Sequence, residues 1–252
     1  MSAAVRNECG RSPDRTCSEP QQSRVEPRAG CGESAARMGR AGRGMRSTAG
    51  PGRLPAASPG NSSIMARFRM PGVEAVLFDR DGTLIEDVPG NADPERVHPM
   101  PGAAEGVALA RECGVGVGVV TNQAAIGDGV LSPEDVDQVN GRVDAVLGPF
   151  DVWEVCPHRA EDGCTCRKPR AGMILSAARR MGVDPARVVV VGDVGSDLEA
   201  AAAAGATGIL VPTSRTREEE IQSAPRLASS VYAAVSSLLA SPLPADGTDG
   251  AW

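Results

Sequence analysis

Short apolar runs alternate with longer segments of helical spacing along most of the chain. The runs predict buried strands, at 73–78, 115–121, 150–155, 187–192 and 207–213. The segments with helical spacing predict helices, at 101–114, 132–148, 171–182, 196–205 and 226–240. Each strand is a continuous apolar run followed by a helix. The pattern therefore indicates an α/β fold with a doubly wound, mainly parallel sheet covered on both faces.

Capping signals mark the starts of two of these helices. Ser132, with Asp135 three residues later, predicts a capping box at the head of the second helix. Ser196 and Glu199 predict another box at the head of the fourth. The glycines near residue 116 lie inside a strand rather than in a strand-to-helix turn, which argues against a dinucleotide-binding fingerprint.

The two ends of the chain show neither the alternation typical of strands nor the spacing typical of helices. Residues 1–70 are rich in Arg, Gly, Ser, Pro and Ala, and we expect them to form a disordered basic arm. A nucleic-acid-binding arm, a transit peptide and a mis-annotated start at Met65 or Met70 are the alternatives. We expect a single domain over 73–240 and a loose tail over 241–252.

Charge and cysteine content narrow the class of protein. The first 72 residues carry twelve arginines against five acidic residues, whereas the remainder carries 14 basic and 27 acidic side chains. An acidic domain argues against a nucleic-acid-binding surface. No apolar run is long enough to span a membrane or to serve as a signal peptide. We expect a cytoplasmic monomer, in which clustered cysteines indicate metal binding or catalysis before disulfides.

Polar side chains follow four of the predicted strands. They are Asp79 and Asp81, then Thr121, Asn122 and Gln123, then Arg167 and Lys168, and finally Asp193 and Asp197. The carboxyl ends of parallel strands meet at one edge of a sheet, where ligands bind. Singly, each of these residues fits ordinary turn chemistry. Together, carboxylates, cations and neutral donors suit Mg²⁺ and a phosphate group. The lysine is the only one among 26 basic residues.

A cluster of soft ligands directly precedes that lysine. Three cysteines and a histidine fall within eleven residues, as Cys156, His158, Cys164 and Cys166. This set is typical of structural Zn²⁺, although its spacing is tighter than that of zinc fingers. A disulfide and redox-active thiols are the alternatives. Four protein ligands would leave zinc no open position for catalysis. Its expected function is to order the loop and to direct Arg167 and Lys168 into the site.

These motifs resemble those of the haloacid-dehalogenase superfamily of phosphohydrolases. The matching strings are FDRDGTL, TNQ, RKP and GDVGSD, in that order, over roughly residues 73–213. The further string C-P-H…C-T-C-R-K-P resembles one branch, which includes D-glycero-D-manno-heptose 1,7-bisphosphate phosphatases and histidinol-phosphate phosphatases. The resemblance implies a Rossmann-like fold and a Mg²⁺-dependent phosphatase.

The resemblance also implies a role for each motif residue. Asp79 is then the nucleophile that forms an aspartyl-phosphate, and Asp81 is the general acid and base. Mg²⁺ is held by the carboxylates of Asp79 and Asp193 and the backbone carbonyl of Asp81, while Asp197 acts on the metal through water. The groups expected at the phosphate itself are Thr121 and Asn122 as donors, with Gln123 beside them, and Arg167 and Lys168 as cations.

The substrate is less firmly implied than the chemistry. The family often has Ser-Gly and Arg-Gly after TNQ, where this chain has Ala124, Ala125 and Asp128. The loop from Asp87 to Gly90 is expected to face the substrate, with too little chain for a cap domain. We expect a small phosphorylated metabolite, with a heptose bisphosphate losing its 7-phosphate as the first choice. The alternatives are histidinol phosphate, a 3′-phosphorylated nucleic-acid end and an inactive zinc-stabilised binding module.

Overall fold

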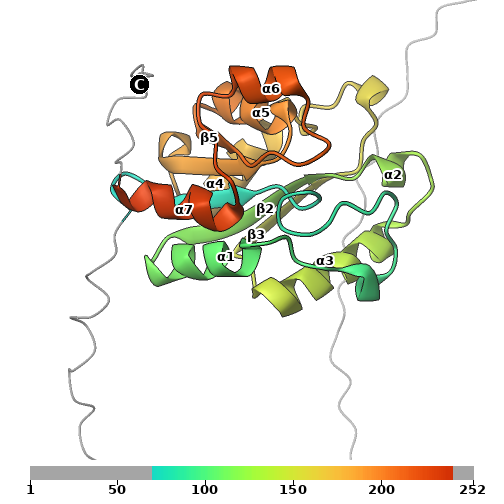
Figure 1. Ribbon diagram of the computed structural model, residues 1–252. Coiled ribbons are helices and arrows are strands. Elements are labelled where there is room, and N and C mark those ends of the chain that lie inside the picture. The colour runs from blue at the N-terminus through green and yellow to red at the C-terminus, as the bar shows by residue number, and fades with distance from the viewer. Residues whose placement is uncertain (1–69, 241–252) are drawn as a thin grey trace, which may run out of the picture. The chain divides into compact units, whose positions relative to one another are not determined.

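A five-stranded parallel sheet forms the centre of the protein (Figure 1). The computed structural model describes residues 70–240, and the predicted arm and tail lie outside this range. The strands are β1 (Ala75–Phe78), β2 (Gly116–Asn122), β3 (Val152–Cys156), β4 (Val188–Gly192) and β5 (Thr207–Leu210). Their order in the sheet is β3-β2-β1-β4-β5, and every pairing is parallel. The predicted doubly wound α/β fold is confirmed.

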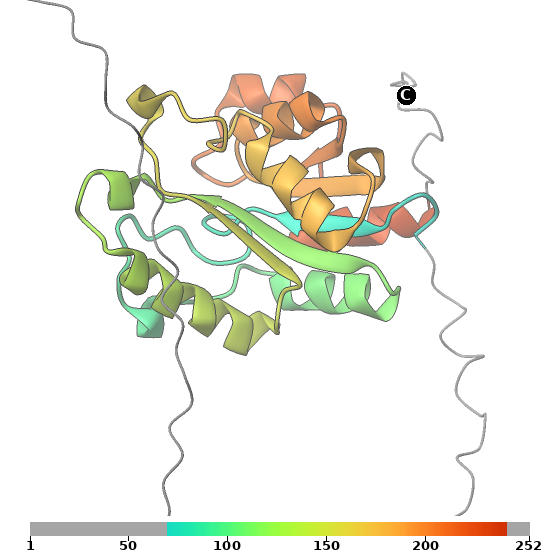
Figure 2. The same ribbon diagram turned by 180° about the vertical axis from the view of Figure 1, so that it is seen from behind.

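Helices cover both faces of this sheet, as Figures 1 and 2 show. One face packs against α1 (Ala103–Glu112), α3 (Pro133–Leu147) and α7 (Val231–Ala240), and the other against α4 (Gly172–Met181) and α5 (Gly195–Ala204). Two further helices, α2 (Ala124–Gly127) and α6 (Glu218–Ser223), were not predicted. They have four and six residues, which is too short to show a helical period in the sequence.

The central strand β1 shows why the apolar runs are continuous. Val76 and Phe78 belong to the core beneath α1, α3 and α7, whereas Ala75 and Leu77 belong to the core beneath α4 and α5. Successive side chains of a strand point to opposite faces, and both faces are buried here. All four side chains are fully buried.

Two local predictions need correction. The capping box at Ser132 is confirmed, but the box expected from Ser196 to Glu199 is wrong. Helix α5 begins earlier, and Asp197 caps it by accepting the backbone N–H of Val194 at 3.2 Å. The last helix begins at Val231 rather than 226, because residues 226–228 run beside the end of β5 and exchange backbone hydrogen bonds with Leu210.

The segment between β1 and α1 stays close to the sheet. Residues 82–102 contain one short 3₁₀ helix, Pro94–Arg96, and no separate cap domain. The site at the carboxyl edge of the sheet is therefore bordered by loops and by the first residues of α2 and α5, without a cap domain.

Within residues 70–240, no helix combines the length and apolar character that crossing a membrane requires.

Candidate active site

Lys168 lies between two buried carboxylates. Its Nζ is 2.6 Å from Oδ1 of Asp79 and 2.6 Å from Oδ1 of Asp197, and it donates to the carbonyl of Val120 at 3.0 Å. Only 3% of the lysine side chain is exposed. A compact ammonium with three donors fits this position better than the planar fork of an arginine. The one lysine of the chain thus has the position that the sequence predicted for it, beside the first carboxylate.

The register of β1 against β4 brings together the carboxylates of Asp79 and Asp193, which could bind a metal ion. Phe78 pairs with Val191, and the next residue, Asp79, donates its backbone N–H to the carbonyl of Val191 at 2.9 Å. The carboxylate of Asp193 therefore lies beside that of Asp79. Each of Asp79, Asp193 and Asp197 offers an oxygen, and these three oxygens lie within 4.8 Å of one another. Such an all-oxygen set fits a hard divalent cation.

Gly82 makes room for this approach. Its φ of +85° is unfavourable for residues with a side chain, and a Cβ placed there would lie 2.4 Å from Oδ2 of Asp193. Asp193 is in turn fixed by hydroxyl groups. Thr83 lies at 3.5 Å from one of its carboxylate oxygens and Thr213 at 3.3 Å from the other, while Thr216 donates to its backbone carbonyl at 2.5 Å. Thr213 and Thr216 follow β5, the strand end that the sequence interpretation did not use.

Burial of several carboxylates at one place raises their proton affinity. Burial raises the pKa of Asp79 to about 8; the ammonium of Lys168 opposes the shift, and the charges of Asp197 and Asp81 add to it. Burial, with the charge of Asp197, raises the pKa of Asp193 to about 6. Burial alone would lower the pKa of Lys168, but Asp197 and Asp79 outweigh it and the pKa is raised. When no metal ion is bound, the carboxylates of Asp79 and Asp193 therefore take up protons near neutral pH.

Asp81 is held by a different set of partners. Its carboxylate accepts hydrogen bonds from Nε and Nη2 of Arg80, at distances between 2.9 and 3.2 Å, and from Nε2 of Gln123 at 2.7 Å. Arg80 is buried, and its Nη1 donates a further hydrogen bond, of 2.7 Å, to Oδ1 of Asn140 on α3. The two aspartates of the first motif thus have separate environments, one beside a lysine and one beside an arginine. The sequence interpretation missed both Arg80 and Asn140.

Asn122 holds the backbone of Lys168. Its Oδ1 accepts the N–H of Lys168 at 3.1 Å, and its Nδ2 donates to the carbonyl of the same residue at 3.2 Å. The amide thus holds the lysine backbone, while its Nδ2 keeps a second N–H at the cavity, which is compatible with the expected donation to a phosphate. Thr121 is buried, and its hydroxyl accepts from Gln123 at 2.9 Å. The hydroxyl hydrogen of Thr121 remains available as a donor.

A cavity of about 470 Å³ opens above these residues. It is lined by most of the predicted site: Asp79, Asp81, Thr121, Asn122, Gln123, Lys168, Asp193, and Asp87 to Gly90. Its mouth also contains Arg215, whose Nη1 lies 2.5 Å from Oδ2 of Asp87. Arg215 was missed, because it stands in a loop after β5 with no recognisable motif. Arg167 does not line this cavity.

The four soft ligands converge beside the end of β3. Cys166 Sγ lies 3.3 Å from that of Cys156 and 3.4 Å from that of Cys164, and Nδ1 of His158 lies 3.2 Å from Cys166 Sγ. These separations are too long for a disulfide, in which the sulfurs are about 2.05 Å apart. A tetrahedron with roughly 2.3 Å metal–sulfur bonds has edges of about 3.8 Å. The sulfurs of Cys156 and Cys164, 3.7 Å apart, match this edge, and the other separations are somewhat shorter. The cluster therefore fits a metal ion held by four protein ligands.

Arg167 belongs to this cluster rather than to the cavity. Its Nη1 donates to the carbonyl of His158 at 3.2 Å, and its N–H points at Sγ of Cys164 at 3.4 Å. The structure thus places Arg167 outside the lining of the cavity, and its contact with a phosphate stays a prediction. The next residue along the chain, Lys168, is the one that enters the site.

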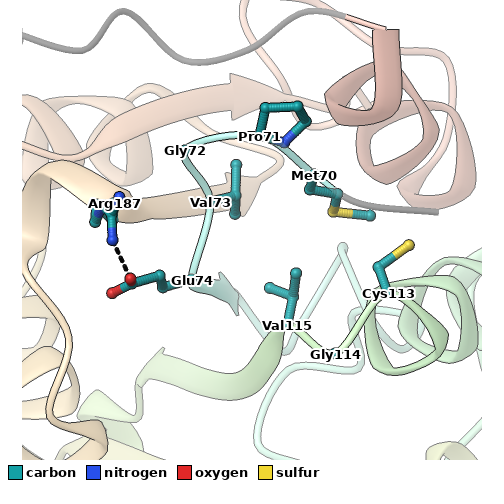
Figure 3. Close-up of a pocket in the computed structure, with 9 residues that line it drawn as sticks. All are labelled: Met70, Pro71, Gly72, Val73, Glu74, Cys113, Gly114, Val115 and Arg187. Carbon is teal, nitrogen blue, oxygen red and sulfur yellow. Dashed lines mark hydrogen bonds and ion pairs between the residues drawn. The ribbon is translucent and has the colours of Figure 1, made fainter. Parts of the chain in front are cut away.

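A second hollow, of about 460 Å³, lies near the start of β1 (Figure 3). Glu74 and Arg187 form an ion pair at its edge, and Met70, Val73 and Val115 supply apolar lining. It gathers no cluster of carboxylates and lies at the amino ends of the strands. The chemistry of the protein is therefore at the opposite edge of the sheet.

Comparisons with known proteins agree with this geometry. Residues 165–238 match the HAD-hydrolase-like family. D-glycero-beta-D-manno-heptose-1,7-bisphosphate 7-phosphatase of Bordetella bronchiseptica is 33% identical over 151 residues, which are 58% of this chain and 84% of that protein. D-glycero-alpha-D-manno-heptose-1,7-bisphosphate 7-phosphatase of Mycobacterium bovis is 37% identical over 142 residues, 52% of this chain and 75% of that protein.

A solved structure is similar over the same region. It is the D,D-heptose 1,7-bisphosphate phosphatase of B. bronchiseptica in complex with magnesium and phosphate, with a TM-score of 0.61 and 31% sequence identity. The alignment covers 67% of this chain and 99% of that one.

A parallel α/β sheet with two aspartates after its central strand and a lysine between buried carboxylates defines a phosphatase of the haloacid-dehalogenase class. The chain belongs to this superfamily, in the branch of the heptose-bisphosphate phosphatases. The family resemblance of the sequence is thereby confirmed.

Proposed function

We propose that the chain removes the 7-phosphate from D-glycero-D-manno-heptose 1,7-bisphosphate in a Mg²⁺-dependent reaction. The single observation that supports the chemistry is the position of Lys168, 2.6 Å from Asp79, whose carboxylate is in turn grouped with that of Asp193. The names of the relatives from Bordetella and Mycobacterium support the substrate. Those names differ in the anomer, so both anomers belong in the test.

In the proposed reaction, Asp79 is the nucleophile and Asp81 is the general acid and base. A carboxylate oxygen of Asp79 attacks phosphorus, the ester P–O bond breaks, and Asp81 gives a proton to the leaving sugar oxygen. Water then attacks the aspartyl-phosphate, Asp81 takes a proton from that water, and the bond to Asp79 breaks to release inorganic phosphate. The separate partners of the two aspartates support this division.

The residues present fit Mg²⁺. The carboxylates of Asp79 and Asp193 and the backbone carbonyl of Asp81 would hold it. When bound, the ion would offset the charges of carboxylate and phosphate and lower their proton affinity. Asp197 would affect the ion indirectly rather than as a direct ligand, because its two oxygens already contact Lys168 and the N–H of Val194.

Lys168 and Thr121 would meet the phosphate itself. A carboxylate and a phosphate at about 4 Å repel by roughly 4 kcal/mol per pair of unit charges at an effective dielectric of about 20. One ammonium can offset a repulsion of that size, whereas a neutral hydrogen bond contributes about 1 kcal/mol. Asn122 would then serve by holding the backbone of Lys168 in place.

We also propose that Cys156, His158, Cys164 and Cys166 bind structural Zn²⁺. Four ligands with thiolate and imidazole groups leave no open coordination position. The reduced thiols that such a site needs suit the cytoplasm. A cavity of about 470 Å³ suits a small metabolite as the substrate, and we propose that the chain acts as a monomer.

The test is phosphate release from a panel of esters in the presence of Mg²⁺. Both anomers of the heptose bisphosphate, histidinol phosphate and a 3′-phosphorylated oligonucleotide belong in the panel. We expect the highest kcat/KM for one of the heptose bisphosphates. A higher kcat/KM for histidinol phosphate or the oligonucleotide would replace the proposed substrate, and no release from any ester would reject the phosphatase reaction.

A further inference from the structure

Arg215 has a different status from the other cations of the cavity. Lys168 is paired with two carboxylates, and Arg80 is buried against Asp81 and Asn140. The side chain of Arg215 is 55% exposed at the mouth, and its one charged partner is Asp87. Among the cationic side chains that line the cavity, it is therefore the one with donors free to meet a ligand.

The backbone around Arg215 is hydrogen-bonded to Asp193, one of the carboxylates that could bind a metal ion. Thr213 and Thr216 stand on either side of it, and both hydrogen-bond to Asp193, at 3.3 Å and 2.5 Å. The N–H of Arg215 donates to the hydroxyl of Thr213 at 3.2 Å. The loop is thus anchored on Asp193, so the backbone from which the Arg215 side chain extends has a fixed position relative to a phosphate bound at the reaction centre.

The partner of Arg215 comes from a different loop that also lines the cavity. Asp87 belongs to the loop after β1, and 24% of its side chain is exposed. Its carboxylate gives the mouth a negative charge where a second anionic group of a substrate would arrive. A second phosphate would be repelled by Asp87 unless a cation met it. The guanidinium can exchange a carboxylate for a phosphate, because both accept its paired N–H groups.

We propose that Arg215 determines specificity for substrates with a second anionic group, by leaving Asp87 and binding the phosphate distant from the scissile bond. This inference rests on the proposed function, since it concerns the non-reacting end of the same substrate. In the heptose bisphosphate, that end is the 1-phosphate. The exchange replaces the ion pair between Arg215 and Asp87 with one between Arg215 and the phosphate, and it breaks no covalent bond.

The experiment compares two substrates that lose the same phosphate. Heptose 1,7-bisphosphate and heptose 7-phosphate differ only in the distal group, so the ratio of their kcat/KM values isolates it. We expect Arg215→Gln to lower this ratio about 10- to 100-fold, mainly through KM of the bisphosphate, as for loss of a charged hydrogen bond. Arg215→Lys keeps the charge and should recover part of the ratio. Rising ionic strength should lower the ratio in the unmodified protein more than in Arg215→Gln.

Arg217 provides a matched control. It lies two residues away, pairs with Glu220 at 2.7 Å, and does not line the cavity. Arg217→Gln should leave the ratio at its original value. An unchanged ratio in Arg215→Gln, or an equal fall in Arg217→Gln, overturns the inference.

Failure of the proposed function would be seen separately, in the unmodified protein. If it hydrolyses p-nitrophenyl phosphate but neither heptose ester, the substrate is wrong. Fructose 1,6-bisphosphate and fructose 6-phosphate, as inhibitors of that hydrolysis, then test the inference. Stronger inhibition by the bisphosphate that Arg215→Gln abolishes supports it, and equal inhibition by both overturns it.

Discussion

The guanidinium of Arg80 joins Asp81 to Asn140 through a buried hydrogen bond of 2.7 Å to the amide oxygen. The position of the proposed general acid therefore depends on α3, a helix that contributes no residue to the reaction itself. We expect Asn140→Leu to leave one Arg80 donor unsatisfied and to lower the free energy of unfolding by about 1–3 kcal/mol.

The same substitution should lower kcat, because Arg80 would no longer be fixed beside Asp81. Asn140→Asp keeps an acceptor of the same size and is the control. Thermal melting and steady-state rates measure the two effects. If Asn140→Leu matches the unmodified protein in both, the link has no function.

Asp79→Asn and Asp81→Asn should each reduce phosphate release by several orders of magnitude while leaving the fold intact. The first removes the nucleophile and the second removes the proton donor. Turnover alongside circular dichroism measures this. Asp137→Asn changes an exposed residue of α3 and should have no effect. Near-normal turnover by Asp79→Asn would exclude a covalent aspartyl-phosphate.

Mg²⁺ binding should strengthen as the pH rises. In the metal-free site, burial raises the pKa of Asp79 to about 8 and that of Asp193 to about 6. Protons held below these values must leave before the ion binds, so affinity falls as the pH decreases through this range. An unperturbed aspartate, with a pKa near 3.9, would give no such dependence.

Calorimetric titration in buffers of different ionisation enthalpy measures the protons released with Mg²⁺. Asp79→Asn should abolish the upper part of the pH dependence. An affinity that stays constant between about pH 6 and 8 would contradict the raised pKa values.

Protein purified without chelators should contain about one zinc per chain. Cys164→Ser should release the metal and reduce activity about 10- to 100-fold, the usual effect of losing a supporting residue. The loss should be partial, because Asn122 still holds the backbone of Lys168. Added Mg²⁺ should not restore the rate.

Elemental analysis and steady-state rates test this. Cys113→Ser is the matched control, since this cysteine lies at the end of α1 and outside the cluster. Active protein without zinc, or a disulfide within the cluster under reducing conditions, would reject the proposal.

A chain that begins at Met65 should keep full activity and melt at nearly the same temperature. The cavity is lined by residues between 79 and 215, and the described core begins with Met70. A chain that begins after Ala75 would lack part of β1 and should not fold. Loss of activity in the chain that begins at Met65 would show that the first 64 residues contribute to the site.

The ends of the strands could be predicted because a strand buried on both faces of the sheet is a continuous apolar run in the sequence. Continuous apolar runs located the strands, and the rule for the carboxyl edge of a parallel sheet then grouped Asp79, Lys168 and Asp193, which line one cavity in the structure. The sequence around the start of α5 is compatible with more than one capping box. The pair Ser196 and Glu199 was predicted, whereas in the structure Asp197 caps the helix. A helix start is decided by where the strand before it ends, which no local pattern contains.

The missed residues depend on long-range packing. Arg80 meets Asn140 only because α3 lies under the end of β1. Arg215 meets Asp87 because two irregular loops face each other across the cavity. Asn122 has a clear motif, but its hydrogen bonds to the backbone of Lys168 join residues 46 positions apart, and a motif does not show such contacts.

The pairing of β1 with β4 also bears on how the protein folds. Thr83 and Asp193 are 110 positions apart in the chain, and Asp79 and Lys168 are 89 apart. A growing chain thus lacks the last metal carboxylate until most of the domain has been synthesised. Parallel strands so distant in sequence pair slowly, because loop-closure entropy must be overcome first. Uptake of Mg²⁺ should therefore mark the completion of folding rather than assist its early steps.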